Sequence, residues 1–221
     1  MIKIENREVV GWEHAIRGAR NPMNSWDRSD SVFEVSDLAF GMKVPRIGPN
    51  DYNLLTRLTN AGSDHGKFMR MIVVYMDITA PLYWWKEYDT YKVGTVANSC
   101  STMHKIHAKE FTLDDFSHEH LLDIGKNDLE LIIKKLNSYR DYYLNEKDKD
   151  IWWHMIQLLP TSYNQKRTVM LNYEVLKKMY HARKNHKLDE WVEFCSWIET
   201  LPYSELITGG TVKRWADNKS Y

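Results

Sequence analysis

Apolar residues recur with the period of a helix in two neighbouring stretches of the chain. In the first, apolar and aromatic side chains follow at helical spacing from Leu129 to Tyr143, and Asn127-x-x-Glu130 before them has the form of a capping box. The second follows a polar turn at 145–150 and ends at Pro160; its apolar stripe is Ile151, Trp152, Met155, Ile156 and Leu159. Two amphipathic helices joined by a short turn predict an antiparallel pair.

Start and stop signals predict three more helices. Asp51 opens one with a leucine stripe, and Asn60-Ala-Gly62 ends it. Asn172 can cap a second, from Tyr173 to about Lys184, because an asparagine oxygen accepts from the first free amides of a helix. The last lies near Leu188 to Thr200 and is expected to bury Trp191, Val192, Cys195 and Ile198.

Two stretches have the composition of strands. The run Met71 to Thr79 is rich in β-forming residues and mostly apolar on both faces, which predicts a strand inside a sheet. Ala80-Pro81 ends it, and the proline is suited to begin a helix from Tyr83 to Tyr91. A shorter strand is predicted from Lys166 to Leu171.

The chain shows no internal division. Residues 21–50 carry much of its proline and glycine among polar residues, so we expect a long loop there. No repeat or flexible linker occurs, and we therefore expect a single domain over residues 1–221. The small, hydroxyl-rich stretch from Gly94 to Ser101 is either a plain turn or a segment that contacts a ligand closely.

Composition argues against several classes of partner. Lysine plus arginine equal aspartate plus glutamate at 30 each, so there is no net field to attract a nucleic acid. The N-terminus lacks an apolar signal core and no stretch approaches the roughly twenty apolar residues of a membrane span, so no membrane partner is expected. The two cysteines, Cys100 and Cys195, have no paired spacing, which fits a reducing, cytoplasmic location.

Metal and hydrolytic chemistry have weak support. The pairs His104/His107, His118/His120 and His181/His186 lack a third ligand at a recognised spacing, so no metal is expected. No Gly-x-Ser-x-Gly elbow is present, which disfavours a serine hydrolase. Nine tryptophans and thirteen tyrosines could line ring-binding pockets or subunit interfaces, although filling of the core is the more ordinary use.

Arg183 is the most informative charged residue. It follows Met179 by four positions and Tyr180 by three, so it lies on the apolar stripe of its helix. Burial without a partner is costly, and the guanidinium should meet a carboxylate, a phosphate or the solvent edge of a pocket. The alternative is an arginine that extends to solvent at a helix C-terminus, where cations are favoured.

The spacing around this helix resembles the C-terminal motif of the flavin-dependent thymidylate synthases. Leu159-Pro160 is followed by Asn172 and then by Arg183; in that family the asparagine contacts flavin and the arginine contacts the substrate nucleotide. Lys166 falls where the family has another arginine that binds dUMP. His186 and Trp191 are similar to the histidine and tryptophan that follow, each shifted by one residue.

A second match covers the earlier part of the chain. It runs from His65 through Ile72-Val73 to Ala80-Pro81-Leu82 and is similar to the family's histidine loop, central strand and next helix. The Arg-His-Arg signature that should follow is replaced by Thr90-Tyr91-Lys92; Thr95 stands at its serine, and Asn98 with Ser101 at its final pair after an insertion. Together the matches span roughly residues 51 to 200, with a fainter echo in Arg17-Gly-Ala-Arg20.

The resemblance implies an α/β (α+β) fold with a central, mostly antiparallel sheet flanked by helices. It implies reductive methylation of dUMP to dTMP, with the methylene group of methylenetetrahydrofolate passing through reduced FAD, which NADPH regenerates. It also implies a homotetramer whose sites combine several subunits. Its site residues would be Lys92, Lys166 and Arg183 at phosphate or uracil oxygens, His65 at the flavin, and Thr95, Asn98, Ser101 and Asn172 as hydrogen-bonding groups, with Thr95 and Arg183 catalytic.

The altered signature leaves two hypotheses. Thr90 and Tyr91 remove a positive charge, a donor fork and an imidazole, which should weaken flavin binding, while Arg70 stands where the family usually has an acidic residue. Either a charge has moved to a compensating position or the pocket has been abandoned. The protein is then a divergent thymidylate synthase, or an enzyme that methylates a related pyrimidine nucleotide, or else a non-catalytic homologue that keeps the oligomeric scaffold.

Overall fold

The computed structural model describes residues 2–33, 36–37, 42–43 and 45–210, which fall into two compact units. The hairpin unit consists of Met1–Asn6, Met76–Lys92 and Ala97–Val169. The α6 unit consists of Arg7–Tyr75, Val93–Val96 and Met170–Tyr221. Whether the chain folds as one domain stays a prediction.

Four strands form the main sheet, in the order β1-β4-β6-β5. Their bounds are Lys3–Val10 (β1), Val73–Pro81 (β4), Asn164–Asn172 (β6) and Val96–Ser99 (β5). The Leu82 amide donates to the Tyr163 carbonyl and the Tyr173 amide to the Ile72 carbonyl, each at 3.0 Å. Because one residue number rises as the other falls, β4 and β6 are antiparallel. The expected antiparallel sheet flanked by helices is confirmed.

The central strand, β4, lies between β1 and β6, as its apolar sequence predicts. Its bounds differ from the expected Met71–Thr79, because Met71 ends the short 3-10 helix η3 (Gly66–Met71). Burial alternates along the strand, so one face is more deeply covered than the other. Pro81 is its last residue and the N-cap of α3 (Leu82–Tyr88), not the first helical residue; that helix ends before the expected Tyr91.

In the hairpin unit, α3 packs on β6 through aromatic side chains. Trp84, Trp85 and Tyr88 are buried, and the rings of Trp84 and Trp85 meet edge to face with centroids 4.9 Å apart. The indole of Trp85 donates to the Gln165 carbonyl at 2.9 Å. For these residues the core-filling interpretation of the aromatic content is confirmed.

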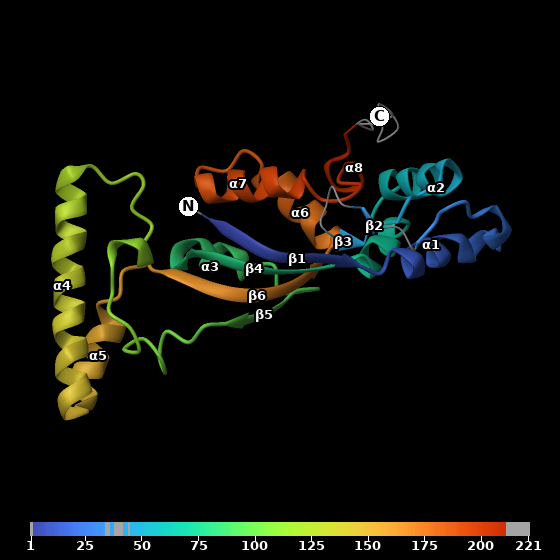
Figure 1. Cartoon of the computed structure of the whole chain (residues 1–221). Helices are drawn as coiled ribbons and strands as arrows, with labels where there is room; N and C mark the ends of the chain where they lie inside the picture. Colours follow the sequence, from blue (N-terminus) through green and yellow to red (C-terminus); the bar gives the residue numbers. More distant parts are fainter. Residues whose placement is uncertain (1, 34–35, 38–41, 44, 211–221) are drawn as a thin grey trace. The chain divides into compact units, whose positions relative to one another are not determined.

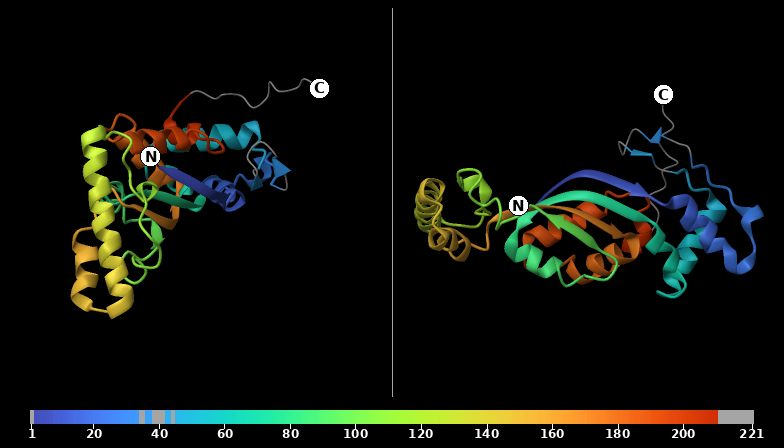
Figure 2. Two further views of the ribbon diagram at one scale, coloured as in Figure 1. Left: turned by 60° about the vertical axis from the view of Figure 1, so that its left-hand side comes forward. Right: turned by 90° about the horizontal axis from the view of Figure 1, so that it is seen from below.

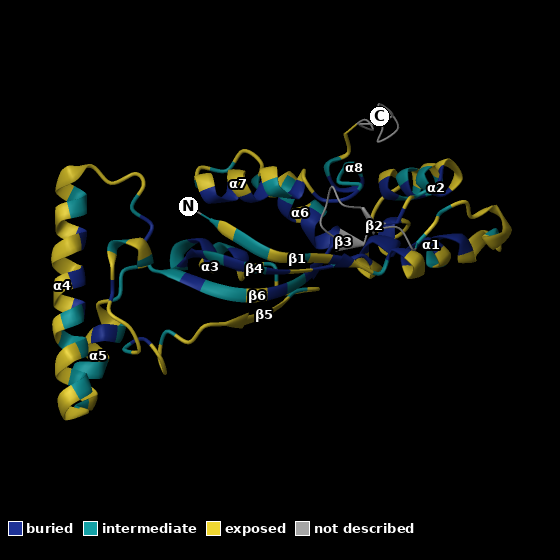
Figure 3. Cartoon of the chain, in the orientation of Figure 1, coloured by how far each residue is buried: buried dark blue, intermediate teal, exposed yellow. Residues whose placement is uncertain are grey.

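The predicted helix pair is α4 (Asp123–Glu146) and α5 (Lys149–Gln157), which lie side by side after the turn at Lys147 and Asp148 (Figures 1 and 2). Figure 3 shows α4 buried along only one side. A core of buried residues joins it to the preceding loop through the 3-10 helix η4 (Leu113–Asp115): Ile106, Phe111, Phe116, Leu129, Ile133 and Leu136.

The capping box expected at Asn127 is wrong. The helix begins at Asp123, one turn earlier, with Leu122 as its N-cap, so Asn127 and Glu130 lie inside it. An acidic residue in the first turn is favourable near the positive end of a helix, and Asp123 provides it.

The α6 unit contains α1 (Trp12–Arg20), α2 (Pro49–Asn60), α6 (Tyr173–Arg183), α7 (Asp189–Ile198) and α8 (Glu205–Thr208). Asn172 caps α6 as predicted, since its Oδ1 accepts from the Val175 amide at 3.1 Å. In α7, Trp191, Cys195 and Ile198 are buried as expected. Val192 is 38% exposed, so its predicted burial is wrong; Phe194 takes an inward position instead.

A buried ion pair between α1 and α2 holds residues 29–31 of the segment between these helices. Arg20 Nε donates to Asp51 Oδ1 at 2.5 Å, and both side chains are almost fully covered. The second carboxylate oxygen accepts from the hydroxyls of Ser29 and Ser31 at 2.8 and 2.6 Å. The segment holds the 3-10 helices η1 (Asn21–Met23) and η2 (Trp26–Arg28) and an antiparallel pair, β2 (Ser36–Asp37) with β3 (Met42–Lys43).

Within the described residues, no helix combines the length and apolar character needed to cross a lipid bilayer.

Candidate functional site

A cavity of about 330 Å³ in the α6 unit lies between the end of α2, the loop that follows it, and one side of α6. This volume is within the range of cavities that hold small ligands. Its lining consists of Thr59, Gly62, Ser63, Gly66, Met69, Glu174, Lys177, Lys178 and His181.

The side of α6 that faces this cavity is charged. Lys177 and Lys178 follow Glu174 by three and four residues, and His181 follows them by four and three, so the four residues share a face. Lys177 Nζ donates to the Thr59 carbonyl at 3.0 Å, and burial lowers the pKa of its ammonium below the ordinary value. The lining carries more positive than negative groups, which suits an anionic ligand.

Glu174, which lines the cavity, forms an ion pair with Arg70 of η3. Arg70 Nη2 lies 3.1 Å from Glu174 Oε1, and Arg70 Nε bonds Glu174 Oε2. The Arg70 hydrogen bond holds the pKa of the Glu174 carboxyl below its usual range. The charge of Arg70 is thus paired with Glu174, and its role as a replacement for the lost signature charge stays a prediction.

Sequence reasoning missed Arg70 with Glu174 as a pair, and the lysines beside them. The signal for the lysines was present, because the polar stripe of α6 has the same helical spacing as its apolar stripe. The pairing of Arg70 with Glu174 spans 104 positions and has no local signature.

His65 lies next to the cavity in sequence, directly before Gly66, and its side chain is exposed. It is the N-cap residue of η3.

Asn172 and the segment that carries Thr95 meet at the start of α6. A Cβ added to Gly94 would lie 3.1 Å from both Asn172 Nδ2 and Val175 Cγ2, so glycine permits the close approach. Gly94 also has φ +82°, in the left-handed region that favours glycine. Thr95, the next residue, is half-buried. Two predicted site residues are thus brought to one end of the helix.

Arg183 lies at the other end of α6, half-buried. Its guanidinium carbon is 5.0 Å from the centroid of the Trp191 ring, a cation–π arrangement. Its Nη1 is 3.0 Å from His186 Nε2. The guanidinium therefore lies against the two residues that the family motif also contains.

The contact between Arg183 and His186 has a consequence for binding. The Leu188 amide donates to His186 Nδ1 at 3.1 Å, so a neutral imidazole carries its proton on Nε2. Arg183 and Nε2–H are then both donors, and one acceptor oxygen can accept from both. This end of α6 can hold a carbonyl or phosphate oxygen.

Lys166 belongs to the hairpin unit, where it meets acids. Its Nζ lies 3.1 Å from Asp77 Oδ2 and 3.8 Å from Glu5 Oε2. Asp77 also accepts from the Thr168 hydroxyl at 2.6 Å and from the side-chain amide of Asn6 at 2.9 Å. These bonds, that of Thr168 foremost, lower the pKa of Asp77 to about 2, while Asp77 raises the pKa of Lys166. The charge of Lys166 is thus compensated on the sheet.

The remaining predicted site residues also lie in the hairpin unit and are exposed. Lys92 follows α3, and Asn98 lies in β5, which is exposed along its whole length (Figure 3). Ser101 Oγ accepts from the amides of Met103 and His104 at 3.2 and 2.8 Å. The Cys100 amide donates to the Lys166 carbonyl at 2.9 Å, so the Asn98–Ser101 stretch runs beside β6.

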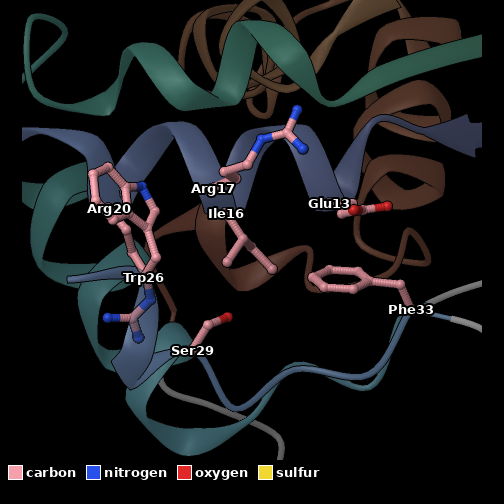
Figure 4. A pocket seen from close by; sticks show the side chains of 7 residues that line it. All are labelled: Glu13, Ile16, Arg17, Arg20, Trp26, Ser29 and Phe33. Atoms are coloured by element: carbon pink, nitrogen blue, oxygen red, sulfur yellow. The ribbon is translucent and has the colours of Figure 1, made fainter. Parts of the chain in front are cut away.

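A second cavity of the α6 unit, about 230 Å³, borders α1 (Figure 4). Arg17 and Arg20, the faint echo in the sequence, both line it, together with Trp26 and Phe33. Arg20 is engaged by Asp51, while Arg17 Nη2 lies 2.9 Å from His14 Nδ1.

The two cysteines differ in exposure. Cys195 is buried, and burial raises the pKa of its thiol to about 11, which disfavours the nucleophilic thiolate. Cys100 is exposed. In the described ranges, no three His, Cys, Asp or Glu side chains are grouped so as to hold a metal ion.

Comparisons with known proteins extend the resemblance to three dimensions. No model of a known protein family matches the chain, and no curated protein sequence does. Thymidylate synthase X (ThyX) from Helicobacter pylori with FAD and dUMP is similar at a TM-score of 0.66 and 14% identity, covering 94% of this chain and 97% of that one. A second complex of that enzyme gives a TM-score of 0.67 at 14% identity, with 93% and 97% covered.

A third structure is the UMP/dUMP methylase PolB from Streptomyces cacaoi bound with 5-Br dUMP. It is similar at a TM-score of 0.60 and 14% identity, with 95% of each chain covered. The chain therefore has the fold of the flavin-dependent thymidylate synthases, and the resemblance seen in the sequence is confirmed for the fold.

Proposed function

We propose that the protein is a divergent flavin-dependent nucleotide methylase. In this proposal it binds a pyrimidine nucleotide and FAD and methylates dUMP, or the related UMP, at the expense of methylenetetrahydrofolate and NADPH. The observation that carries the proposal is the position of Asn172 and Arg183 at the two ends of α6, at the spacing of the family motif. The fold around them overlaps nucleotide-binding methylases over almost the whole chain.

The cavity beside α6 fits part of a flavin. Lys177 and Lys178 supply positive charge, and Gly62 has open space where a side chain would lie. In this proposal Asn172 and His65 border the same ligand. Bound flavin would supply the redox chemistry of the methylene transfer, which amino-acid side chains do not provide.

The chain's own residues bind and orient the nucleotide. Arg183 and the Nε2–H of His186 donate to one oxygen of the uracil ring or the phosphate, and Trp191 holds the guanidinium in place. Thr95, Lys92, Asn98, Ser101 and Lys166 are proposed as further polar contacts. Asp77 would have to share Lys166 with the ligand, which lowers the contribution of that lysine.

A non-catalytic homologue is the second candidate, and a specific observation favours it. Thr90, Tyr91 and Lys92 replace the Arg-His-Arg signature, Lys92 is exposed, and Lys166 is compensated by Asp77. These substitutions reduce the positive charge available to two anionic ligands. Such a protein would keep nucleotide binding at α6 without turnover.

We also propose a homo-oligomer, a tetramer by analogy with the resembled family, in which several copies complete each site. The free cysteines suit a reducing cytoplasm.

The test is formation of dTMP from dUMP, with UMP assayed in parallel, in the presence of methylenetetrahydrofolate, FAD and NADPH. Arg183→Gln should lower kcat/KM by at least about tenfold, because a charged hydrogen bond to substrate is lost. Lys184→Gln, the adjacent exposed charge, is the matched control and should leave it unchanged. Nucleotide binding that Arg183→Gln abolishes, without turnover, selects the non-catalytic candidate; absence of both binding and turnover ends both.

A further inference from the structure

A third cavity, of about 350 Å³, lies in the hairpin unit where α4 gives way to α5. It contains none of the residues assigned above to the nucleotide or the flavin. Its lining is Met103, His104, His107, Tyr143, Lys147, Lys149 and Trp152.

Positive and aromatic groups surround this cavity. Lys147 lies in the turn between the two helices, and Lys149 is the first residue of α5. No carboxylate is among the lining residues. Asp148, which lies between the two lysines, accepts from the Asp150 amide at 2.8 Å as the N-cap of α5. Glu146 and Asp150 also flank the two lysines in sequence, and neither is among the residues that line the cavity.

One ring nitrogen of His107, Nδ1, has no hydrogen-bond partner in the described residues. Its Nδ1 is buried and makes no hydrogen bond within the described residues, although buried polar atoms are normally satisfied. Its ring packs edge to face on Tyr143, with centroids 4.9 Å apart. Arg140, one helical turn before Tyr143 on α4, donates from Nε to the backbone carbonyl of His107 at 3.0 Å. This bond holds the loop at His107 against α4.

The surroundings of His107 disfavour the positively charged form of its imidazole. Burial foremost, and then Lys147, Lys105 and Arg140, lower the pKa of its imidazole. Lys149 lines the same cavity, so its ammonium group and that of Lys147 add to one sign of charge there. An anion placed here would be attracted by both of them.

The walls are also held in place. The Trp152 indole donates to the Met103 carbonyl at 3.1 Å, which joins α5 to the loop. Lys147 Nζ lies 5.5 Å from the centroid of Tyr143, so the ammonium is positioned over the ring.

From this geometry we infer a binding site for a small oxyanion, a phosphate or carboxylate group, held by Lys147, Lys149 and the imidazole of His107. A shift of the His107 ring that uncovers Nδ1 would let an anion oxygen accept a hydrogen bond from Nδ1–H, an atom whose surface is covered in the structure. The ammonium groups of the two lysines balance its charge. The site is separate from the proposed nucleotide methylation and does not depend on it.

The experiment follows the imidazole of His107 by NMR while the full-length protein is titrated with inorganic phosphate, or with acetate, at constant ionic strength set by sodium chloride. Binding should raise the pKa of His107 because the anion stabilises the imidazolium. A response to phosphate, to acetate, or to both supports the site and defines which oxyanion it takes. No response to either, or an equal response to chloride, overturns it.

Lysine variants locate the effect. Lys147→Gln combined with Lys149→Gln should weaken phosphate or acetate binding at least about tenfold, since charge-assisted contacts are lost. Lys134→Gln combined with Lys135→Gln, two exposed lysines elsewhere on α4, removes the same charge and should leave binding unchanged. Equal weakening by both pairs would show general electrostatic attraction and contradict a built site.

Discussion

Arg70 and Glu174 join η3 to the first turn of α6, with Arg70 Nη2 3.1 Å from Glu174 Oε1. Arg70 places a positive charge where the resembled family usually has an acid. Glu174, which lines the cavity, is the partner of that charge. An arginine that departs from the family pattern is thus the partner of Glu174, one of the residues that line the cavity.

Reversal of this ion pair tests its role. Arg70→Glu and Glu174→Arg should each lower the urea midpoint of unfolding, because like charges then face each other. The double variant should recover part of the loss, although an arginine in the first turn of a helix is itself unfavourable. Lys67→Glu, at an exposed position of the same 3-10 helix, is the control. Losses that simply add in the double variant would show that the two side chains do not interact.

Substitutions at Asn172 can separate the cap from the ligand contact. Asn172→Ala should cost about 1 kcal/mol of stability, the usual penalty for a lost N-cap. Asn172→Asp keeps an acceptor for the Val175 amide, so stability should stay near that of the wild type. It removes the side-chain N–H donor, and we expect FAD affinity to fall about tenfold. Denaturant unfolding and flavin titration of both variants check this; unchanged FAD affinity in Asn172→Asp would contradict the flavin contact.

Gly94 offers a test of the packing at the start of α6. Gly94→Ala should destabilise the protein by more than about 1 kcal/mol, because a positive φ is strained for alanine and the new methyl group meets Asn172 and Val175 at 3.1 Å. Gly62→Ala is a matched control, since its φ is +105° with open space around the added carbon. Thermal unfolding of both should show the larger loss for Gly94→Ala; equal losses would mean that crowding at Asn172 adds nothing.

Acid should weaken the polar cluster on the sheet. The pKa of Asp77 is about 2 in the folded protein and is therefore below the value of an unfolded chain. A depressed pKa contributes stability that is complete above about pH 4 and is lost as the pH falls towards 2. Urea unfolding between these limits should show a steeper fall for the wild type than for Asp77→Asn. Parallel curves would contradict the assignment.

Local signals were enough to predict much of the fold. The helix period gave α4 and α5, and the side chain of Asn172 gave the start of α6, because both depend on residues close in sequence. The strand β1 was not expected: its sequence is largely charged and only Val9 is buried. The first turn of α4 was also missed, since Leu122 at its N-cap has no side chain that caps.

The candidate site was predictable only where its residues follow one another on a helix. Asn172 and Arg183 share α6, and their spacing is visible in the sequence. The partners of Arg70 and Lys166 lie far away in the chain, so a count of charges could not show that Glu174 and Asp77 compensate them. The roles of Lys92, Thr95, Asn98 and Ser101 stay predictions.

The central claim is that this chain binds flavin and then a pyrimidine nucleotide beside α6. The most direct measurement is the visible absorbance of FAD during titration with the purified protein, followed by addition of dUMP. We expect a saturable change of the flavin band and a second change on dUMP that Arg183→Gln abolishes and Lys184→Gln preserves. A flavin spectrum that neither the protein nor dUMP alters would contradict the claim.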